Sequence, residues 1–201
     1  MNFVLSGIEL PVRITPATPM NDEELMQFCA ANEALRVERE PNGEILVMTP
    51  AGGRTGNINI RIGRFLDVWA EVDGRGLAFD SSTGFTLPDG SMRNPDGAWV
   101  LASRWNELSE KDQGRFAPIC PDFVIELRSP SDRLPDVQEK MQMWIANGAE
   151  VAWLIDPVDP NAKAVTVYRP GTQPEHHANP TSVQGTGPIA GFELVLARVW
   201  Q

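Results

Sequence analysis

The segment from Pro121 to Gly148 constrains the fold of this chain more than any other, because it joins a buried strand, a polar turn and an amphipathic helix. Side chains alternate between the two faces of a strand, so Glu126 and Arg128 share one face of the strand expected at residues 123–128, roughly 6–7 Å apart. Burying charge is costly unless the group is paired or coordinates a metal. Two interpretations follow: an ion pair at the edge of a sheet, or part of a functional site.

The helix that follows the turn carries a further charge on its apolar side. Pro135 suits the first turn of this helix. Apolar residues at helical spacing define its buried face: Val137, Met141, Trp144 and Ile145. Lys140 is three residues after Val137 and four before Trp144, and it therefore points the same way. Either the stem of Lys140 packs while its ammonium reaches water, or Lys140 leans toward Glu126.

A second carboxylate comes from Asn94-Pro95-Asp96-Gly97, a turn sequence just before the strand expected at residues 98–101. Most aspartates in turns only satisfy backbone donors. Here, however, one aspartate enters a strand, Glu126 lies within a core strand, and a cation is nearby. Two carboxylates can hold Mg²⁺, which takes oxygen ligands and keeps several waters. A nearby lysine or arginine can orient the water or stabilise phosphate charge.

The N-terminal part of the chain shows clear signals for a helix and a hairpin. A short strand is expected at Glu9–Ile14. Asn21 and Glu24 form a capping box that starts a helix over residues 22–32. Alternating apolar and charged residues then predict a hairpin over residues 35–48, with an Asn-Gly turn that supplies the positive φ angles a hairpin needs.

The remaining pattern predicts a mixed fold with more strands than helices. One long helix ends at the turn over residues 73–76, and its apolar face consists of Ile58, Ile62, Phe65, Leu66, Trp69 and Val72. Short strands are expected at residues 77–79, 84–87, 98–101, 151–155, 164–168 and 192–196. Residues 103–118 are expected to form a loop with a helical turn, and residues 170–187 a loop or an irregular hairpin. We therefore expect an α/β (α+β) fold with helices packed on a mixed sheet. A single domain is expected over residues 1–201, with residues 1–18 as an N-terminal extension.

The net charge restricts the partners that this chain can have. Its 27 acidic and 17 basic residues leave a charge of −10 at pH 7, whereas proteins that bind nucleic acid over a broad surface are usually basic. A local basic groove, or a metal that neutralises phosphate, stays open. Two cysteines without metal-binding spacing fit a reducing compartment. With no signal-peptide pattern and no membrane-spanning stretch in the sequence, we expect a cytoplasmic protein that does not enter a membrane.

In these segments the chain resembles the Uma-two family of the PD-(D/E)XK restriction-endonuclease-like superfamily. The similarity rests on Asn94-Pro95-Asp96, on residues 121–132 with the run ELRSPSD, on Lys140 and Trp144, and on residues 147–149 and 153–157. It extends to residues 38–50 and 191–194, so that it covers roughly residues 20–198.

The resemblance implies a central mixed sheet flanked by helices, and an endonuclease that hydrolyses phosphodiester bonds of DNA with Mg²⁺ or Mn²⁺. It assigns Asp96 and Glu126 as metal ligands, with Glu38 as a further acid that contacts a second metal or water. The superfamily has a lysine two residues after the acid, where this chain has Arg128, which stays protonated and is a poor general base. We therefore expect Lys140 to supply the catalytic cation, with Arg128 in support. Since such nucleases cut two strands, we expect a homodimer.

Two other interpretations compete with an active nuclease. The chain could keep the fold as a binding or structural module without useful turnover, which the acidic charge and Arg128 at the lysine position favour. Alternatively, Glu126, Arg128 and Lys140 form a buried structural ion network. A metal site at His176-His177 is a weaker possibility, because adjacent histidines on a strand point to opposite faces.

Overall fold

The computed structural model describes residues 10–200 of the 201-residue chain. The chain divides into two compact units, and each unit is made of several segments of sequence. Unit 1 comprises Met1–Gly52, Gly84–Asn94 and Leu108–Ile119, and unit 2 comprises Gly53–Thr83, Pro95–Glu107 and Cys120–Gln201. The single domain expected over residues 1–201 stays a prediction, because two compact units can be parts of one domain.

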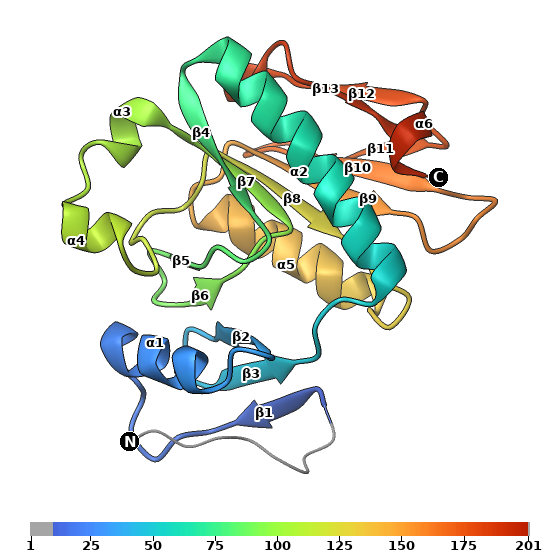
Figure 1. Cartoon of the computed structure of the whole chain (residues 1–201). Helices are drawn as coiled ribbons and strands as arrows, with labels where there is room; N and C mark the ends of the chain where they lie inside the picture. Colours follow the sequence, from blue (N-terminus) through green and yellow to red (C-terminus); the bar gives the residue numbers. More distant parts are fainter. Residues whose placement is uncertain (1–9, 201) are drawn as a thin grey trace. The chain divides into compact units, whose positions relative to one another are not determined.

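Unit 1 is built on a five-stranded sheet in the order β1-β3-β2-β6-β5, in which all neighbouring strands are antiparallel (Figure 1). Its strands are β1 (Val12–Ile14), β2 (Arg36–Arg39), β3 (Ile45–Met48), β5 (Phe85–Thr86) and β6 (Met92–Arg93). Its helices are α1 (Asp22–Ala31) and α4 (Glu110–Gln113). Apolar side chains from α1, β2, β3 and β6 form its core: Leu25, Phe28, Val37, Ile45, Val47 and Met92.

The N-terminal elements form where the sequence predicts them. The Asn21 side chain accepts a hydrogen bond from Glu24 N at 3.0 Å, and the Glu24 carboxylate accepts one from Asn21 N at 3.0 Å, which confirms the capping box. Gly43 has a φ of +86°, as the turn between β2 and β3 requires. β1 begins at Val12, and Glu9, where the predicted strand begins, lies outside the described residues.

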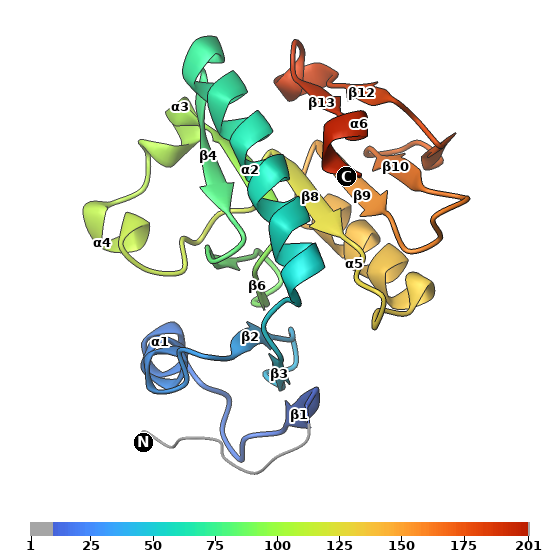
Figure 2. The ribbon, with the colours of Figure 1, turned by 45° about the vertical axis from the view of Figure 1, so that its right-hand side comes forward.

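Unit 2 is built on a six-stranded mixed sheet in the order β11-β10-β9-β8-β7-β4. β8 and β9 are parallel, and all other neighbours are antiparallel. The strands are β4 (Gly76–Asp80), β7 (Gly97–Leu101), β8 (Phe123–Leu127), β9 (Val151–Asp156), β10 (Ala164–Tyr168) and β11 (Glu175–Ala178). Helix α2 (Gly53–Asp73) packs on one face of this sheet and helix α5 (Leu134–Ala146) on the other (Figures 1 and 2). The mixed α/β fold is therefore confirmed.

The central strand β8 is buried on both faces and divides them as the alternation predicts. Phe123, Ile125 and Leu127 lie in the main core together with the buried face of α2. Val124 and Glu126 consequently face α5. A charged side chain is thus directed toward the layer between β8 and α5.

The predicted apolar face of α2 is wrong at one residue, Val72. Ile58, Ile62 and Leu66 are buried, but Val72 is 86% exposed. The core contacts of α2 end at Ala70, so the last turn of the helix extends beyond the core and leaves Val72 uncovered.

Several short elements were not predicted. The turn at residues 88–91 leads into β6 rather than β7, because two residues are too few to show a period. Helices α3 (Ala102–Trp105) and α4 occupy the segment expected to be a loop with one helical turn. β11 and β12 (Ser182–Gln184) lie in the segment expected to be a loop or an irregular hairpin, and they pair with β10 and β13. β13 (Glu193–Val195) lies within the strand expected at residues 192–196, and η1 (Gly187–Ile189) and α6 (Leu196–Val199) complete unit 2. Within residues 10–200, no helix has the length and apolar character needed to cross a bilayer.

Candidate active site

Glu126 on β8 is held by two side chains from α5. Its Oε1 lies 3.0 Å from Lys140 Nζ and accepts a hydrogen bond from Trp144 Nε1 at 2.8 Å. The Glu126 residue is 5% exposed, and the Lys140 side chain is 21% exposed. The ammonium of Lys140 therefore reaches Glu126, which decides between the two interpretations of this lysine.

The local sequence explains why α5 delivers these two groups. The Asp132 carboxylate accepts a hydrogen bond from Ser129 N at 2.7 Å and closes the polar turn after β8. Pro135 lies in the first turn of α5, where its missing N–H costs nothing. Residues four apart share one face of a helix, so Lys140 and Trp144 both face β8.

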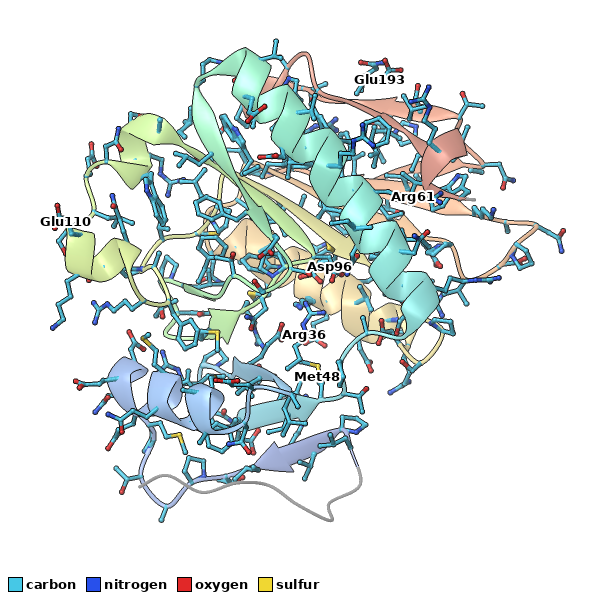
Figure 3. All side chains as sticks on the ribbon, in the orientation of Figure 1. Arg36, Met48, Arg61, Asp96, Glu110 and Glu193 are labelled. Atoms are coloured by element: carbon cyan, nitrogen blue, oxygen red, sulfur yellow. The ribbon has the colours of Figure 1, made fainter. Side chains whose placement is uncertain are left out.

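Asp96 is held by a different set of donors at the start of β7. Its Oδ2 accepts a hydrogen bond from the backbone N of Leu127 at 2.8 Å, and its Oδ1 accepts one from Asn59 Nδ2 at 3.0 Å. Asp96 N also donates to Ile125 O at 3.0 Å. Asp96 is 5% exposed and lies beside α2 (Figure 3). The carboxylate thus takes the place of a backbone carbonyl and extends the pairing of β7 with β8.

The strand register relates the two carboxylates. Gly97 of β7 pairs with Ile125 of β8, Asp96 is the residue before Gly97, and Glu126 is the residue after Ile125. Asp96 and Glu126 therefore belong to adjacent positions of two paired strands. Both acids are buried, and each is held by its own donors.

The donor atoms of Asp96, Glu126 and Asn59 are of the kind that binds a divalent cation. Asn59 Oδ1 is buried and has no hydrogen-bond partner among the described residues, although Asn59 Nδ2 is fixed on Asp96. An orphaned amide oxygen and two carboxylates are the hard ligands that Mg²⁺ prefers, and Mg²⁺ usually needs only one or two carboxylates with several waters. Within residues 10–200, no group of three or more His, Cys, Asp or Glu side chains is arranged to hold a metal. The metal proposal therefore rests on Asp96 and Glu126.

Arg128 does not pair with Glu126 as its place on the strand suggested. Arg128 Nη1 lies 2.8 Å from Asp156 Oδ2, and Arg128 Nε donates to Asp132 O at 3.2 Å. Arg128 lies just beyond the end of β8, next to Asp156, the last residue of the parallel neighbour β9. Glu126 is instead paired with Lys140. Of the two interpretations of Glu126 and Arg128, the ion pair between them is therefore not the arrangement that these contacts form. The supporting catalytic role of Arg128 stays a prediction.

Glu38 belongs to unit 1, where it is 2% exposed. Its Oε2 lies 3.2 Å from Arg93 Nη1, and its Oε1 accepts a hydrogen bond from Asn94 N at 3.3 Å. Arg93 also pairs with Glu40. Burial raises the pKa of Glu40, but the hydrogen bonds and charges of Arg93 and Arg13 outweigh burial and hold that pKa below its ordinary value. Glu38 is thus part of a buried ion network, and its role as a metal ligand stays a prediction.

The histidines lie on β11. His176 Nδ1 is 3.2 Å from Thr166 Oγ1, and His177 Nε2 is 3.2 Å from Glu175 Oε1. A pocket of about 500 Å³ opens between α5 and β10–β11, with Gln142, Tyr168 and His176 among its lining residues. This pocket does not include either carboxylate of the candidate site.

Two members of the candidate site were not identified from the sequence. Asn59 shares a helical row with Ile62, Leu66 and Ala70, and an amide in an apolar row is a signal that could have found it. Trp144 was assigned only to the apolar face. A buried indole N–H needs an acceptor, which is the signal that points to a partner such as Glu126.

Comparisons with known proteins bear on the family and the fold of this chain. The Uma2 family model, described as "Putative restriction endonuclease", matches residues 22–197. None of the curated proteins matches. A crystal structure of a putative nuclease belonging to DUF820 from Anabaena variabilis has a TM-score of 0.70 and 21% sequence identity, and the match covers 90% of this chain and 98% of that chain. At 21% sequence identity, this structural similarity is evidence for the fold alone.

The matched residues include the turn that carries Asp96, the strand that carries Glu126 and the helix that carries Lys140. The match also includes both units and leaves out only the two ends of the chain. The chain therefore belongs to the Uma2 family, whose members are described as putative restriction endonucleases.

Proposed function

We propose that this chain is a metal-dependent endonuclease that hydrolyses phosphodiester bonds of DNA with Mg²⁺ or Mn²⁺. The observation that carries the proposal is the placement of Asp96 and Glu126 on adjacent positions of β7 and β8, with Lys140 on Glu126. Two buried carboxylates, of which Glu126 lies beside an ammonium, supply the kinds of group that metal-assisted hydrolysis of a phosphodiester uses. Membership in a family of putative restriction endonucleases supports the same reaction.

The residues that would hold the ion are Asp96 and Glu126, with the amide oxygen of Asn59 as a further ligand or as an acceptor for a bound water. When bound, the ion supplies positive charge for the phosphate and a more acidic water. A metal also answers the objection raised by the net charge of −10, because it neutralises phosphate where the protein surface does not.

The chain's own side chains orient the carboxylates and add charge. Trp144 fixes one oxygen of Glu126, and Asn59 together with Leu127 N fixes both oxygens of Asp96. Fixed donors and charges cost no reorganisation when the reaction occurs. The ammonium of Lys140 adds positive charge next to Glu126, where it stabilises the charge that grows on the phosphate.

Cleavage of supercoiled plasmid DNA tests this proposal directly. Wild-type protein is expected to cut with Mg²⁺ or Mn²⁺ and not with EDTA. Asp96→Asn, Glu126→Gln and Lys140→Met should each lower the rate by about 10²-fold or more, the loss typical of removing one electrostatic contact from an active site. Lys111→Met, which removes an exposed lysine of α4, is the control and should cut at the wild-type rate.

Circular dichroism spectra of the same variants separate loss of chemistry from loss of fold. If Asp96→Asn and Glu126→Gln are folded and cut as well as wild type, the assignment of the site is wrong. RNA and single-stranded DNA of the same sequence belong in the assay, because they decide which nucleic acid the site accepts.

A nuclease-fold module without useful turnover is the second candidate. The observation that favours it is that Arg128, at the superfamily's lysine position, pairs with Asp156. Calorimetric titration with Mg²⁺ discriminates the two candidates. Absence of Mg²⁺ binding together with absence of cleavage would leave Glu126, Lys140 and Trp144 as a structural network. In that case removing Glu126 should destabilise the fold by about 3–5 kcal/mol, the cost of breaking a buried pair.

A further inference from the structure

The outer face of α2 carries a row of exposed apolar side chains. Ile60 is 69% exposed, Val68 is 52% exposed and Val72 is 86% exposed. With Arg64 between them, these residues follow one another at intervals of four, which places them in one continuous row along a helix. Single exposed apolar residues are normal, whereas several on one row form a surface that favours burial.

Charges on the same face are ordered along the helix. Arg64 lies near the middle of α2, and Asp67 and Glu71 lie closer to its C-terminal end. Among the described residues none of these three side chains makes a hydrogen bond or an ion pair. In contrast, the neighbouring Arg61 donates to Arg198 O at 2.6 Å (Figure 3), and Asp73 lies 2.8 Å from Arg75. The unpaired charges are therefore those of the outer face.

When two copies of this helix lie antiparallel, the basic residue of each copy faces the acidic residues of the other. We propose that the outer face of α2 binds α2 of a second copy of this chain in an antiparallel dimer, with the two-fold axis midway between Ile60 and Val72. In that arrangement Ile60 contacts the partner's Val72. Arg64 lies beside the partner's Asp67 and Glu71. A two-fold axis makes each of these contacts twice.

The middle of the helix also has room for close approach. Gly63 lies between Ile60 and Asp67 on this side of α2, and a Cβ placed on it would have no neighbour within 4 Å. Glycine weakens the interior of a helix, and beyond the neighbouring turns of α2 itself no atom of this chain lies within 4 Å of the place that a Cβ on Gly63 would take. Because Gly63 has no side chain, a second helix can approach α2 more closely at this position.

Sedimentation equilibrium over a range of protein concentrations tests the dimer. Wild-type protein is expected to dimerise, and Ile60→Glu or Val72→Glu should raise the dimer dissociation constant by at least about tenfold. Glu139→Arg, which reverses an exposed charge on α5, is the control and should leave that constant unchanged. The measurement needs neither metal nor DNA, so its outcome is independent of the proposed nuclease activity.

A charge exchange makes the test specific for this pairing. Arg64→Glu alone and Glu71→Arg alone should each weaken the dimer, and the double variant should restore it. Positions 64 and 71 are two turns apart, about 10 Å along the helix, so their exchange can restore contact only between copies. A monomeric wild type, a dimer that tolerates Ile60→Glu and Val72→Glu, or a double variant that is no better than the single ones would each overturn the proposal.

Discussion

The contacts of Glu126 show how one buried carboxylate is kept in a fixed orientation. A single oxygen, Oε1, receives both the ammonium of Lys140 and the indole N–H of Trp144. The charge-assisted contact with Lys140 supplies much of the interaction energy of the carboxylate. The Trp144 side chain has only two torsions, so its indole N–H fixes the orientation of the carboxylate. The indole is thus a positioning group for the acid, and removing it should affect geometry more than charge.

Replacing Trp144 with phenylalanine tests this role. Trp144→Phe removes the hydrogen bond to Glu126 and should lower the free energy of unfolding by about 1–3 kcal/mol beyond the loss of ring volume. Trp153→Phe is the matched control, because Trp153 is equally buried but its Nε1 has no hydrogen-bond partner among the described residues. Urea unfolding of both variants gives the comparison. Equal losses would show that the Trp144–Glu126 hydrogen bond adds nothing to stability.

Among the helices and strands, those whose sequence signal lies within a few neighbouring residues could be predicted. The capping box at Asn21, the turn at Gly43 and the strand-turn-helix from β8 to α5 each carry their signal within a few residues of sequence. β6 was missed because it is two residues long and exists through its pairing with β2 and β5. The choice of Asp156 as partner for Arg128 depends on which strand lies next to β8, and no local pattern contains that information.

The turn between β2 and β3 allows a controlled measurement of a steric effect. Gly43 and Gly90 have nearly equal φ angles of +86° and +84°. A Cβ on Gly43 would lie 2.8 Å from Pro19 Cβ, whereas a Cβ on Gly90 would meet nothing within 4 Å. Both alanine variants should lose about 1–2 kcal/mol for the left-handed backbone, and Gly43→Ala should lose more.

Thermal unfolding of the two variants gives the difference. Each additional kcal/mol lowers the melting temperature by about 2–4 °C in a chain of this size. If Gly90→Ala is as destabilising as Gly43→Ala, the approach of Pro19 has no energetic weight.

At the scale of the whole molecule, the site can be followed through its effect on stability. A ligand that binds only the folded state stabilises it by RT ln(1 + [L]/Kd), or about 1.4 kcal/mol when free Mg²⁺ exceeds Kd tenfold. We therefore expect Mg²⁺ to raise the melting temperature of the wild type. Asp96→Asn should abolish that rise, because a neutral amide is a weaker ligand although its oxygen can still accept from Leu127 N.

Salt at equal ionic strength is the control for this measurement. A chain with a net charge of −10 gains some stability from any cation that screens repulsion. An equal rise with Na⁺ and Mg²⁺, or the same rise in Asp96→Asn, would contradict a specific site.

The assembly of unit 1 from separated segments has a consequence for the chain while it is being made. β2 pairs with β3 on one edge and with β6 on the other, through Arg39 and Met92. About fifty residues separate these two strands, which at about 5–20 residues per second corresponds to roughly 3–10 s of synthesis. During that interval the nascent hairpin has an open edge of unpaired N–H and C=O groups. β2 therefore leaves the ribosome before β6 has been made, and its open edge can pair with another chain during this interval.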